Sequence, residues 1–431
     1  VTGPGIGPDP ALPEPFATES AVRFADVVGW PQGAAPRAAE GFTVNAFARD
    51  LQIPRWPYVL PNGDVLVSQA RFTDPQGVPP ELLKELEEAG MTGGSPNTIT
   101  LLRDADGDGA AEVRETFAEG LSQPFGMLLL DDWLYVANTD ALRRWRFREG
   151  QTRLEGPGEK VLDLPAGGYN NHWTRNVVAT PDGSTLYVSV GSATNVDEEG
   201  VDVKDERRAA ILRVAPDGSG MRVFASGLRN PNGMDFEPST GVLWTVVNER
   251  DGLGDDLVPD YLTSVREGAF YGWPYAYWGP HPDPRKAEER PDLVEKSVPP
   301  DYGLGAHTAS LGLLFDDAVS FPEPFEGGAF VAQHGSWNRA VFNGYRVLFV
   351  PFEGGRPSGP PLELLGGFVP DGQGTEVYGR PVGLAALPDG SLLVADDAAG
   401  VLWRVAPNAG AAAASGAAAA AGAGRPDTAA E

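Results

Sequence analysis

The sequence predicts an all-β fold, a six-bladed β-propeller, from three observations. The 431 residues include 55 Gly and 40 Pro, and this density of turn formers favours many short strands over long helices. A unit of two short apolar strands joined by a tight Pro-Asp-Gly-like turn recurs six times. One such unit cannot bury both of its faces without neighbours, so the copies are expected to pack side by side in a ring.

The six copies align on the residue five positions before each turn. These residues are Trp56, Gly126, Asn176, Gly233, Gly312 and Gly383, at spacings of 70, 50, 57, 79 and 71. Compact blades repeat every 40 to 50 residues or so, and we therefore expect long loops between some strands. Apolar segments at 211–214, 345–352 and 401–405 supply further strands of the blades.

The segments outside the repeats are of three kinds. Residues 1–45 form an extended Pro/Gly/Ala-rich arm, residues 46–407 form the propeller, and residues 408–431 form an Ala/Gly-rich tail that we expect to be disordered. The segment Pro79–Gly90 predicts an inserted helix, because proline opens it, leucines recur at helical spacing and glycine closes it.

Composition excludes several classes of partner. The formal net charge is −27 without any basic run, which opposes binding to nucleic acid or to anionic lipid. There is no apolar stretch long enough for membrane insertion. The absence of cysteine excludes disulfides and thiolate sites. Because the chain opens with Val1, we expect a periplasmic or secreted protein whose targeting segment has been removed.

Polar residues recur at one end of the expected propeller, because the loop before a blade's first strand and the loop after its second lie at the same end. The residues three or four positions before the aligned ones include Gln123, His172, Trp173, Arg229, Asn230, Thr308 and Arg380. The loops after the second strands include 248–251 and 333–339. Arginines gathered there in so acidic a chain predict an anionic ligand, whereas any single residue of the set is also compatible with an ordinary solvated turn.

Three of the four histidines, His172, His307 and His334, map to this rim. They lie on different blades without the short spacing of zinc ligands, so a general base is favoured over a metal site. His172 is the candidate base, and His281 in a Pro-rich insertion is interpreted as structural.

Two loops are candidate calcium sites. Asp104, Asp106, Asp108 and Glu112 alternate around glycines in the pattern of an acidic Ca²⁺ loop, between segments that read as strands. We expect a calcium-binding hairpin with Glu112 rather than Glu115 as ligand, the alternative being a solvated acidic turn. At the rim, the Gly-rich loop 248–256 offers carboxylates and backbone carbonyls for a cation near the ligand, the alternative being an ordinary polar turn.

The rim motifs resemble those of the PQQ-dependent sugar dehydrogenases, in particular the sorbosone dehydrogenase-like and soluble quinoprotein glucose dehydrogenase-like group. The similarity runs from about Gly41 to Val405. The motifs that carry it are NNHWTRN (170–176), GLRNPNGMDFEP (227–238), NERDGLGDDL (248–257), GAFYGWPY (268–275), QHGSWNR (333–339) and GRPVGLAALPDG (379–390).

The resemblance implies an oxidoreductase that uses pyrroloquinoline quinone (PQQ) and Ca²⁺. By analogy, His172 takes a proton from a sugar hydroxyl or hydrate as hydride passes to the quinone, with Arg229 and Gln123 beside it. The residues expected around PQQ are Arg229, Asn230, Arg250, Asp251, Trp337, Asn338, Arg339 and Arg380, with the carbonyls of Arg250 and Asp251 on Ca²⁺. The substrate would be an aldose or sorbosone-like sugar, the electron acceptor a quinone, cytochrome or dye, and the protein a monomer or homodimer.

The sequence departs from the glucose-oxidising branch in two places. Asn171 stands where that branch has an acid before the histidine, and Arg339 stands in a loop where that branch has a lysine. These departures favour the sorbosone or broader aldose branch. Two alternatives stay open: a Ca²⁺-dependent lactonase-like hydrolase, which requires carboxylates from several blades at the axis, and a propeller that binds protein or glycan without catalysis.

Overall fold

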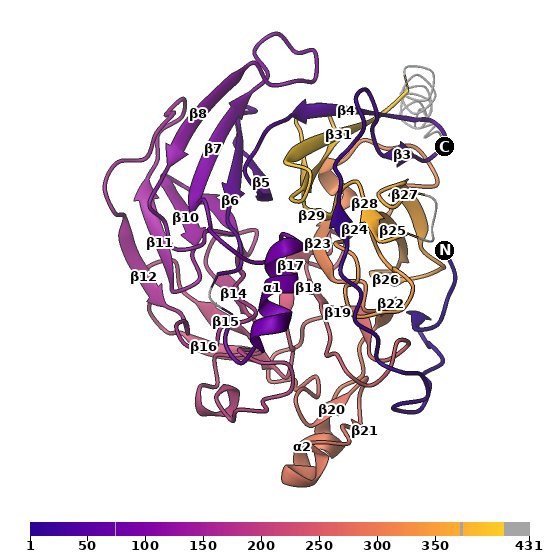
Figure 1. Ribbon diagram of the computed structural model, residues 1–431. Coiled ribbons are helices and arrows are strands. Elements are labelled where there is room, and N and C mark those ends of the chain that lie inside the picture. Colours follow the sequence, from indigo (N-terminus) through magenta and orange to yellow (C-terminus); the bar gives the residue numbers. More distant parts are fainter. Residues whose placement is uncertain (74, 371–373, 409–431) are drawn as a thin grey trace, which may run out of the picture.

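The structure, a computed structural model, describes residues 1–73, 75–370 and 374–408. Six antiparallel sheets stand in a ring, and this confirms the predicted six-bladed propeller (Figure 1). Each aligned repeat forms the first two strands of a blade. Among the described residues, no helix is long and apolar enough to cross a membrane.

The first three blades are plain four-stranded sheets in chain order. Blade 1 consists of β5 (Pro54–Val59), β6 (Val65–Gln69), β7 (Thr98–Arg103) and β8 (Val113–Ala118). Blade 2 consists of β9 (Met127–Leu130), β10 (Trp133–Ala137), β11 (Ala141–Arg146) and β12 (Glu159–Asp163). Blade 3 consists of β13 (Arg175–Ala179), β14 (Leu186–Val190), β15 (Ala210–Val214) and β16 (Arg222–Ser226).

The last three blades take up strands from the beginning of the chain. Blade 4 has β17 (Pro231–Phe236), β18 (Leu243–Val247), β19 (Pro259–Ser264), β22 (Tyr302–Ala306) and β1 (Ile6–Gly7). Blade 5 has β23 (Ser310–Phe315), β24 (Gly328–Gln333), β25 (Arg346–Glu353), β27 (Leu362–Gly366) and β3 (Arg37–Ala38), with β26 (Arg356–Pro357) paired to β25. Blade 6 has β29 (Pro381–Ala386), β30 (Leu392–Asp396), β31 (Val401–Pro407) and β4 (Phe42–Ala48).

Blade 6 closes the ring, because its outer strand comes from the opposite end of the chain. Strand β4 pairs antiparallel with β31 from Phe42–Pro407 to Ala48–Leu402. It starts a few residues before the domain boundary expected at 46, so the propeller takes in the end of the expected arm. The rest of the arm lies along blades 4 and 5 through β1 and β3, and β2 (Asp26–Val27) pairs parallel with β28 (Glu376–Val377). Most of the expected tail, residues 409–431, lies outside the described residues.

The insertions between strands carry the remaining elements. Helix α1 (Pro80–Glu88) joins β6 to β7 and confirms the predicted inserted helix; in Figure 1 it crosses the front of the ring. The long loop of blade 4 holds β20 (Ala276–Tyr277), β21 (His281–Pro282), η2 (Ala287–Glu289) and α2 (Pro291–Lys296). Two short 3-10 helices, η1 (Asp202–Lys204) and η3 (Asp316–Ala318), complete the described elements.

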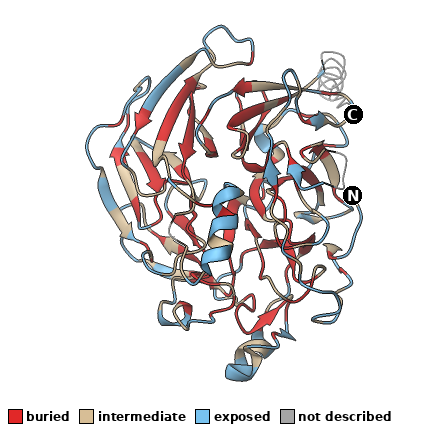
Figure 2. Cartoon of the chain, viewed as in Figure 1, coloured by how far each residue is buried: buried red, intermediate tan, exposed pale blue. Residues whose placement is uncertain are grey.

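The core lies between blades, and the innermost strands β5, β9, β13, β17, β23 and β29 contact one another around the channel. The second strand of each blade is buried along its whole length or nearly so, whereas β12 and the first four residues of β8, at the outside, are exposed or half-buried (Figure 2). The aligned residues lie where the innermost strands approach most closely. A methyl group on Gly126 would lie 2.8 Å from Asn176 Cα, and one on Gly383 would lie 2.9 Å from Trp56 Cα. These glycines allow the blades to close around the axis.

Gly126→Ala is therefore expected to lower the free energy of unfolding by about 1–3 kcal/mol, because the added methyl group overpacks the junction of blades 2 and 3. Gly94→Ala is the control, since a methyl group there meets nothing within 4 Å. Thermal or denaturant unfolding of the two variants measures the difference, and equal stabilities would contradict this role of Gly126.

Candidate active site

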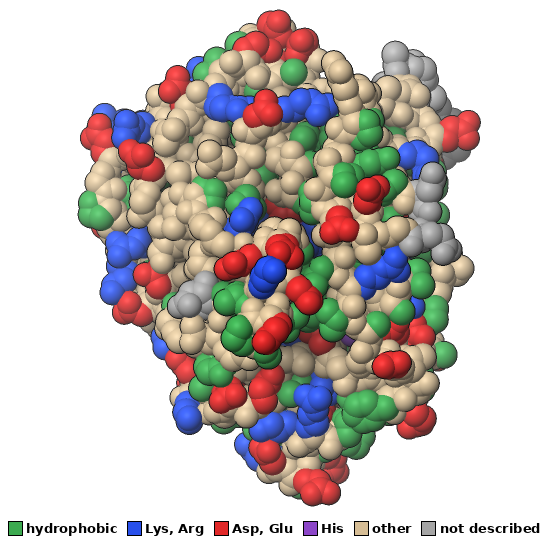
Figure 3. Space-filling model, in the orientation of Figure 1, with side chains coloured by type: hydrophobic (Ala, Val, Ile, Leu, Met, Phe, Trp, Pro, Cys, Tyr) green, Lys and Arg blue, Asp and Glu red, His purple; other side chains and the backbone are tan. Residues whose placement is uncertain are grey.

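A cavity of about 830 Å³ lies at the end of the channel where the predicted rim residues gather. We call it the rim cavity. Loops before and after blade strands line it, together with the insertion that holds α1. Figure 3 views the molecule from the side of α1, where acidic side chains gather over the helix. Of the predicted site residues, the lining includes His172, Asn230, Trp337 and Arg380.

The His172 ring is held through one of its nitrogens. Nδ1 lies 2.9 Å from Ser192 O and 2.8 Å from Ser192 Oγ. Ser192 Oγ donates its own proton to Thr194 O at 2.7 Å, so both Ser192 oxygens act as acceptors toward the ring. The network therefore places the ring proton on Nδ1 and leaves Nε2 unprotonated, without a hydrogen-bond partner among the described residues. Burial and the nearby charge of Arg229 lower the pKa of His172 well below its usual value, so the ring is a neutral proton acceptor at pH 7.

The loop that carries His172 is fixed from below by a buried arginine. The Arg175 guanidinium donates to His172 O at 2.7 Å, Thr174 O at 2.9 Å, Pro165 O at 2.7 Å and Asn170 Oδ1 at 2.8 Å. Burial and the neighbouring Arg208 lower the pKa of Arg175 to about 9. Because Arg175 holds three carbonyls around His172, it sets the position of the ring.

The same loop is joined to the insertion. Asn171 Oδ1 accepts from Gln76 N and Asn171 Nδ2 donates to Gln76 O, both at 3.3 Å. The residue that departs from the acid of the glucose-oxidising branch thus connects the candidate base to the segment around α1.

Arg229 lies behind the cavity lining. It is 3% exposed, and its five N–H donors all have partners within the protein. These partners are Asn195 O, Asn195 Oδ1, Asn248 O, Glu249 O and Asp251 Oδ2. In this arrangement Arg229 acts on His172 through its charge and holds the rim loop of blade 4. Although burial opposes the shift, Arg229 and His307 lower the pKa of Asp251 to about 2.

Four other predicted residues also serve the surrounding structure rather than the lining. Asn338 donates to the Asp251 carboxylate and to His307 Nδ1. Arg250 is buried against Asp283 at 2.7 Å, and Arg339 donates to Asp256 Oδ1 at 2.7 Å. Gln123 Nε2 donates to Arg71 O at 2.8 Å. Their roles toward a cofactor stay predictions.

The residues that do line the cavity offer one unpaired amide oxygen, a cation and a flat ring. The Asn230 side-chain oxygen is buried without a hydrogen-bond partner. Arg380 donates to His334 O at 3.1 Å and to Gly335 O at 2.9 Å. The Trp337 ring stacks on Phe24 of the N-terminal arm, with ring centroids 5.7 Å apart and planes 9° apart.

Sequence reasoning missed a buried ionic cluster in the cavity wall. Asp397 pairs with Arg55 and accepts from His334 Nε2 at 2.9 Å, and the Arg55 guanidinium lies over the Trp173 ring. Burial and Arg380 lower the pKa of His334 to about 4, so this histidine is neutral at pH 7. Arg55 directly precedes the aligned residue Trp56, but the sequence gives no sign that its partner lies 342 positions away.

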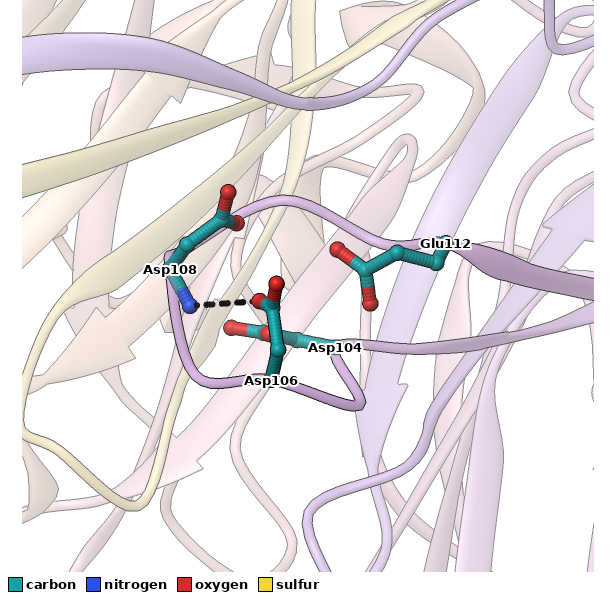
Figure 4. A group of neighbouring side chains, drawn as sticks. All are labelled: Asp104, Asp106, Asp108 and Glu112. Atoms are coloured by element: carbon teal, nitrogen blue, oxygen red, sulfur yellow. Dashed lines mark hydrogen bonds between the residues drawn. The ribbon is translucent and has the colours of Figure 1, made fainter.

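The acidic loop of blade 1 brings its four predicted ligands together. One carboxylate oxygen from each of Asp104, Asp106, Asp108 and Glu112 lies within 4.8 Å of the others (Figure 4). The flanking segments are strands β7 and β8, as predicted, and Glu115 lies within β8 outside the group. The loop also touches blade 6, because Asn45 Nδ2 donates to Gly109 O at 2.7 Å and Ala111 N donates to Phe47 O at 2.8 Å.

The six-bladed ring and the cationic cavity at one end of its channel define a propeller with an enzyme-like site on its axis. Residues 135–336 match the family model described as Glucose / Sorbosone dehydrogenase. This match covers just under half of the chain and confirms the predicted resemblance to that family.

One relative and two solved structures are also similar to this chain, and the two structures, at 19% and 20% identity, show the shared fold alone. The aldose sugar dehydrogenase YliI of Escherichia coli (strain K12) is 26% identical over 195 residues, which cover 40% of this chain and half of that relative. The calcium structure of the Trichoderma reesei Carbohydrate-Active Enzymes Family AA12 protein has a TM-score of 0.70 at 19% identity and covers 87% of this chain and 97% of its own. The holo form of the pyranose dehydrogenase PQQ domain from Coprinopsis cinerea has a TM-score of 0.67 at 20% identity, and the match covers 89% of this chain and 100% of that structure's chain.

Asp397→Ala is expected to lower the free energy of unfolding by about 3–5 kcal/mol, because it leaves the buried Arg55 charge without its partner. The double variant Arg55→Met/Asp397→Leu removes both charges and should lose less stability than the single variant. Chemical denaturation of the two proteins tests this. A double variant as unstable as the single one would show that the pair matters through its shape rather than its charge.

Proposed function

We propose that this protein is a PQQ- and Ca²⁺-dependent dehydrogenase that oxidises an aldose or sorbosone-like sugar, with His172 as the general base. The observation that carries the proposal is the neutral His172 ring, held through Nδ1 with Nε2 unpaired in a cavity lined by arginine. The similar Coprinopsis structure is the holo form of a PQQ domain, and the similar Trichoderma structure is a calcium structure. These two similarities support PQQ and Ca²⁺ as the cofactors. We extend those cofactors to this chain by analogy.

The rim cavity fits a flat polycarboxylate. Arg380 supplies a cation, the Asn230 amide has an unsatisfied oxygen, and Trp337 supplies an aromatic ring, all in the lining. PQQ, when bound, supplies an ortho-quinone that accepts a hydride. Of its predicted contacts, these three residues are the ones in position to hold it directly. Arg229, Arg250, Asn338 and Arg339 would act by shaping and charging the loops behind the lining.

The protein's own contribution to the reaction is proton transfer and orientation. A hydroxyl placed within hydrogen-bond distance of His172 Nε2 can give its proton to the ring. The Ser192 oxygens then stabilise the positive ring through Nδ1–H, and Arg175 keeps the ring in place. Arg229 keeps His172 unprotonated before the reaction, because its charge opposes a second one nearby.

We place Ca²⁺ at two loops. At the rim, the carbonyls of Arg250 and Asp251 and the Asp251 carboxylate would hold a cation, which adds positive charge to the side of the cavity where Arg229 lies. In blade 1, Asp104, Asp106, Asp108 and Glu112 would hold a second, structural ion that braces the contact between blades 1 and 6.

The other parts of the proposal follow from the class of enzyme. Residues 46–407 would form the catalytic domain, with 1–45 as its arm, and electrons would pass to an external quinone, cytochrome or dye. We further propose a periplasmic or secreted location and a monomeric or homodimeric state. The lactonase alternative is disfavoured, because Glu88 and Asp397 are the only carboxylates of the described cavity lining and each has a cationic partner.

His172→Ala is expected to reduce turnover by about 10²–10⁴-fold, because the hydroxyl proton loses its acceptor, while PQQ uptake changes little. Dye reduction by the reconstituted protein, with PQQ titration alongside, measures both quantities. His281→Ala is the control, since His281 is exposed, outside the cavity lining, and held by a hydrogen bond to Trp278 O at 2.8 Å and by stacking on Tyr277. If His172→Ala abolishes PQQ uptake, His172 binds the cofactor instead, and if wild-type protein takes up no PQQ, the proposed function is wrong.

Ca²⁺ at a hundredfold excess over its Kd should stabilise the wild-type protein by about 2.7 kcal/mol through the hairpin. Asp106→Asn/Asp108→Asn should lose this gain, because two ligand charges are removed. Melting curves in Ca²⁺ and in EDTA measure it, with Asp131→Asn/Asp132→Asn in another exposed turn as the control. A hairpin variant that keeps the full response to Ca²⁺ would place the stabilising ion elsewhere.

A further inference from the structure

We propose that the substrate carries an anionic group, a carboxylate or a phosphate on the sugar, and that Arg71 in the wall of the rim cavity binds it. The proposal rests on the function proposed above and deepens it by naming the class of sugar. It makes Arg71 a specificity-determining residue.

Arg71 lies at the neck of the insertion that holds α1. Arg71 comes two residues after strand β6, and its backbone N–H donates to Ser95 Oγ at 2.9 Å. The next residue, Phe72, accepts through its carbonyl oxygen from Gly93 N at 3.2 Å and from Thr92 Oγ1 at 3.0 Å. These bonds join the two ends of the insertion. The insertion thereby forms one wall of the rim cavity, which consists of Arg71, Phe72 and residues 88–91 and 94–96.

A second anchor holds Arg71 from the side of blade 2. Gln123 Nε2 donates to Arg71 O at 2.8 Å, and the Gln123 backbone N–H donates to Asn97 Oδ1 at 3.1 Å. Gln123 has a backbone φ of 47°, a left-handed conformation that non-glycine residues adopt at a cost. The backbone at Arg71 is thus fixed on both sides, and Gln123 is a positioning residue for Arg71.

The Arg71 guanidinium, by contrast, has little to bind. None of the ion pairs among the described residues includes it, Nε is buried without a partner, and Nη1 makes one long hydrogen bond of 3.5 Å to Thr92 O. Arg55 in the same cavity is paired with Asp397. A cation with unused donors, in a cavity of a protein with a net charge of −27, is set up to receive an anion.

Arg71 and the candidate base His172 line the same cavity, and the insertion that follows Arg71 is bonded to the loop of His172. The insertion bonds to Asn171 through Gln76, and Asn171 precedes His172. The candidate PQQ residues Asn230, Trp337 and Arg380 come from the loops of blades 4, 5 and 6, whereas Arg71 comes from the insertion wall. The insertion therefore presents Arg71 to whatever molecule His172 deprotonates.

The anionic group takes no part in the redox step. In the proposed oxidation, PQQ would accept the hydride from the sugar carbon and pass the two electrons to an external acceptor, while His172 Nε2 would take the hydroxyl proton and the carbon–oxygen bond would become a carbonyl. The carboxylate or phosphate stays unchanged and orients the sugar.

The test compares wild-type holoenzyme with Arg71→Gln and Arg71→Lys, using D-glucuronate and glucose 6-phosphate against D-glucose. We expect the wild-type protein to prefer at least one anionic sugar in kcat/KM. Arg71→Gln should reduce that preference about 10–100-fold, mainly through KM, since a hydrogen bond to a charged group contributes about 1.5–3 kcal/mol. Arg71→Lys should restore part of it. The two anionic sugars distinguish carboxylate from phosphate recognition.

PQQ titration of the same variants separates substrate binding from cofactor binding. Unchanged PQQ affinity in Arg71→Gln supports the proposal, and a large loss of PQQ affinity overturns it, because Arg71 would then hold the cofactor. An unchanged preference also overturns it. Arg153→Gln is the control, since Arg153 is an exposed arginine paired with Glu119.

Failure of the proposed function would be visible separately. If wild-type protein takes up no PQQ, calorimetric binding of D-glucuronate and glucose 6-phosphate still decides the present inference. Binding that Arg71→Gln weakens supports an anion site at Arg71, and binding that is equal in both proteins, or absent from both, overturns it.

Discussion

The pairing of β4 with β31 is the constraint on which the site depends. It joins the two ends of the propeller sequence, and without it blade 6 would lack its outer strand. Closure brings the first strand of blade 1 against the first strand of blade 6. The buried ion pair between Arg55 and Asp397 spans this same junction, so the cavity wall exists only in the closed ring. The acidic hairpin contacts β4 from outside and adds a second brace at the place where the ring is joined.

The charge state of the rim depends on the burial of His172 and on two buried arginines, Arg229 and Arg175, which lie next to it and also lower its pKa. Arg229 has all its donors satisfied and yet faces His172 through its charge, which keeps the imidazole neutral. The same charge stabilises the Asp251 carboxylate, so one arginine keeps a base unprotonated and an acid ionised. Arg175 adds a second buried cation beneath His172, held by carbonyl oxygens rather than by a carboxylate. None of the ion pairs among the described residues includes Arg175, although the charge of Asp140 opposes the lowering of its pKa.

The sequence was sufficient for those features that repeat or that lie close together along the chain. The aligned residues identified the innermost strands, and the spacing of Asp104 to Glu112 identified a hairpin whose carboxylates converge. Position in a repeat also placed His172 correctly at the rim. It did not show side-chain direction. Arg250 and Arg339 lie in rim loops but bond to Asp283 and Asp256, and such pairings depend on tertiary contacts that no local pattern records.

The insertion explains two residues that the repeat alone left without a clear partner. Gln123 occupies a rim position equivalent to Arg380, yet its side chain holds the backbone of Arg71. Asn171 replaces an acid next to the histidine, and its amide can both accept from and donate to Gln76, which a carboxylate cannot do. Both residues therefore attach the insertion to the propeller, one at its neck and one beside His172. A wall fixed at two points thus carries Arg71, which belongs to none of the ion pairs among the described residues, into the same cavity as His172.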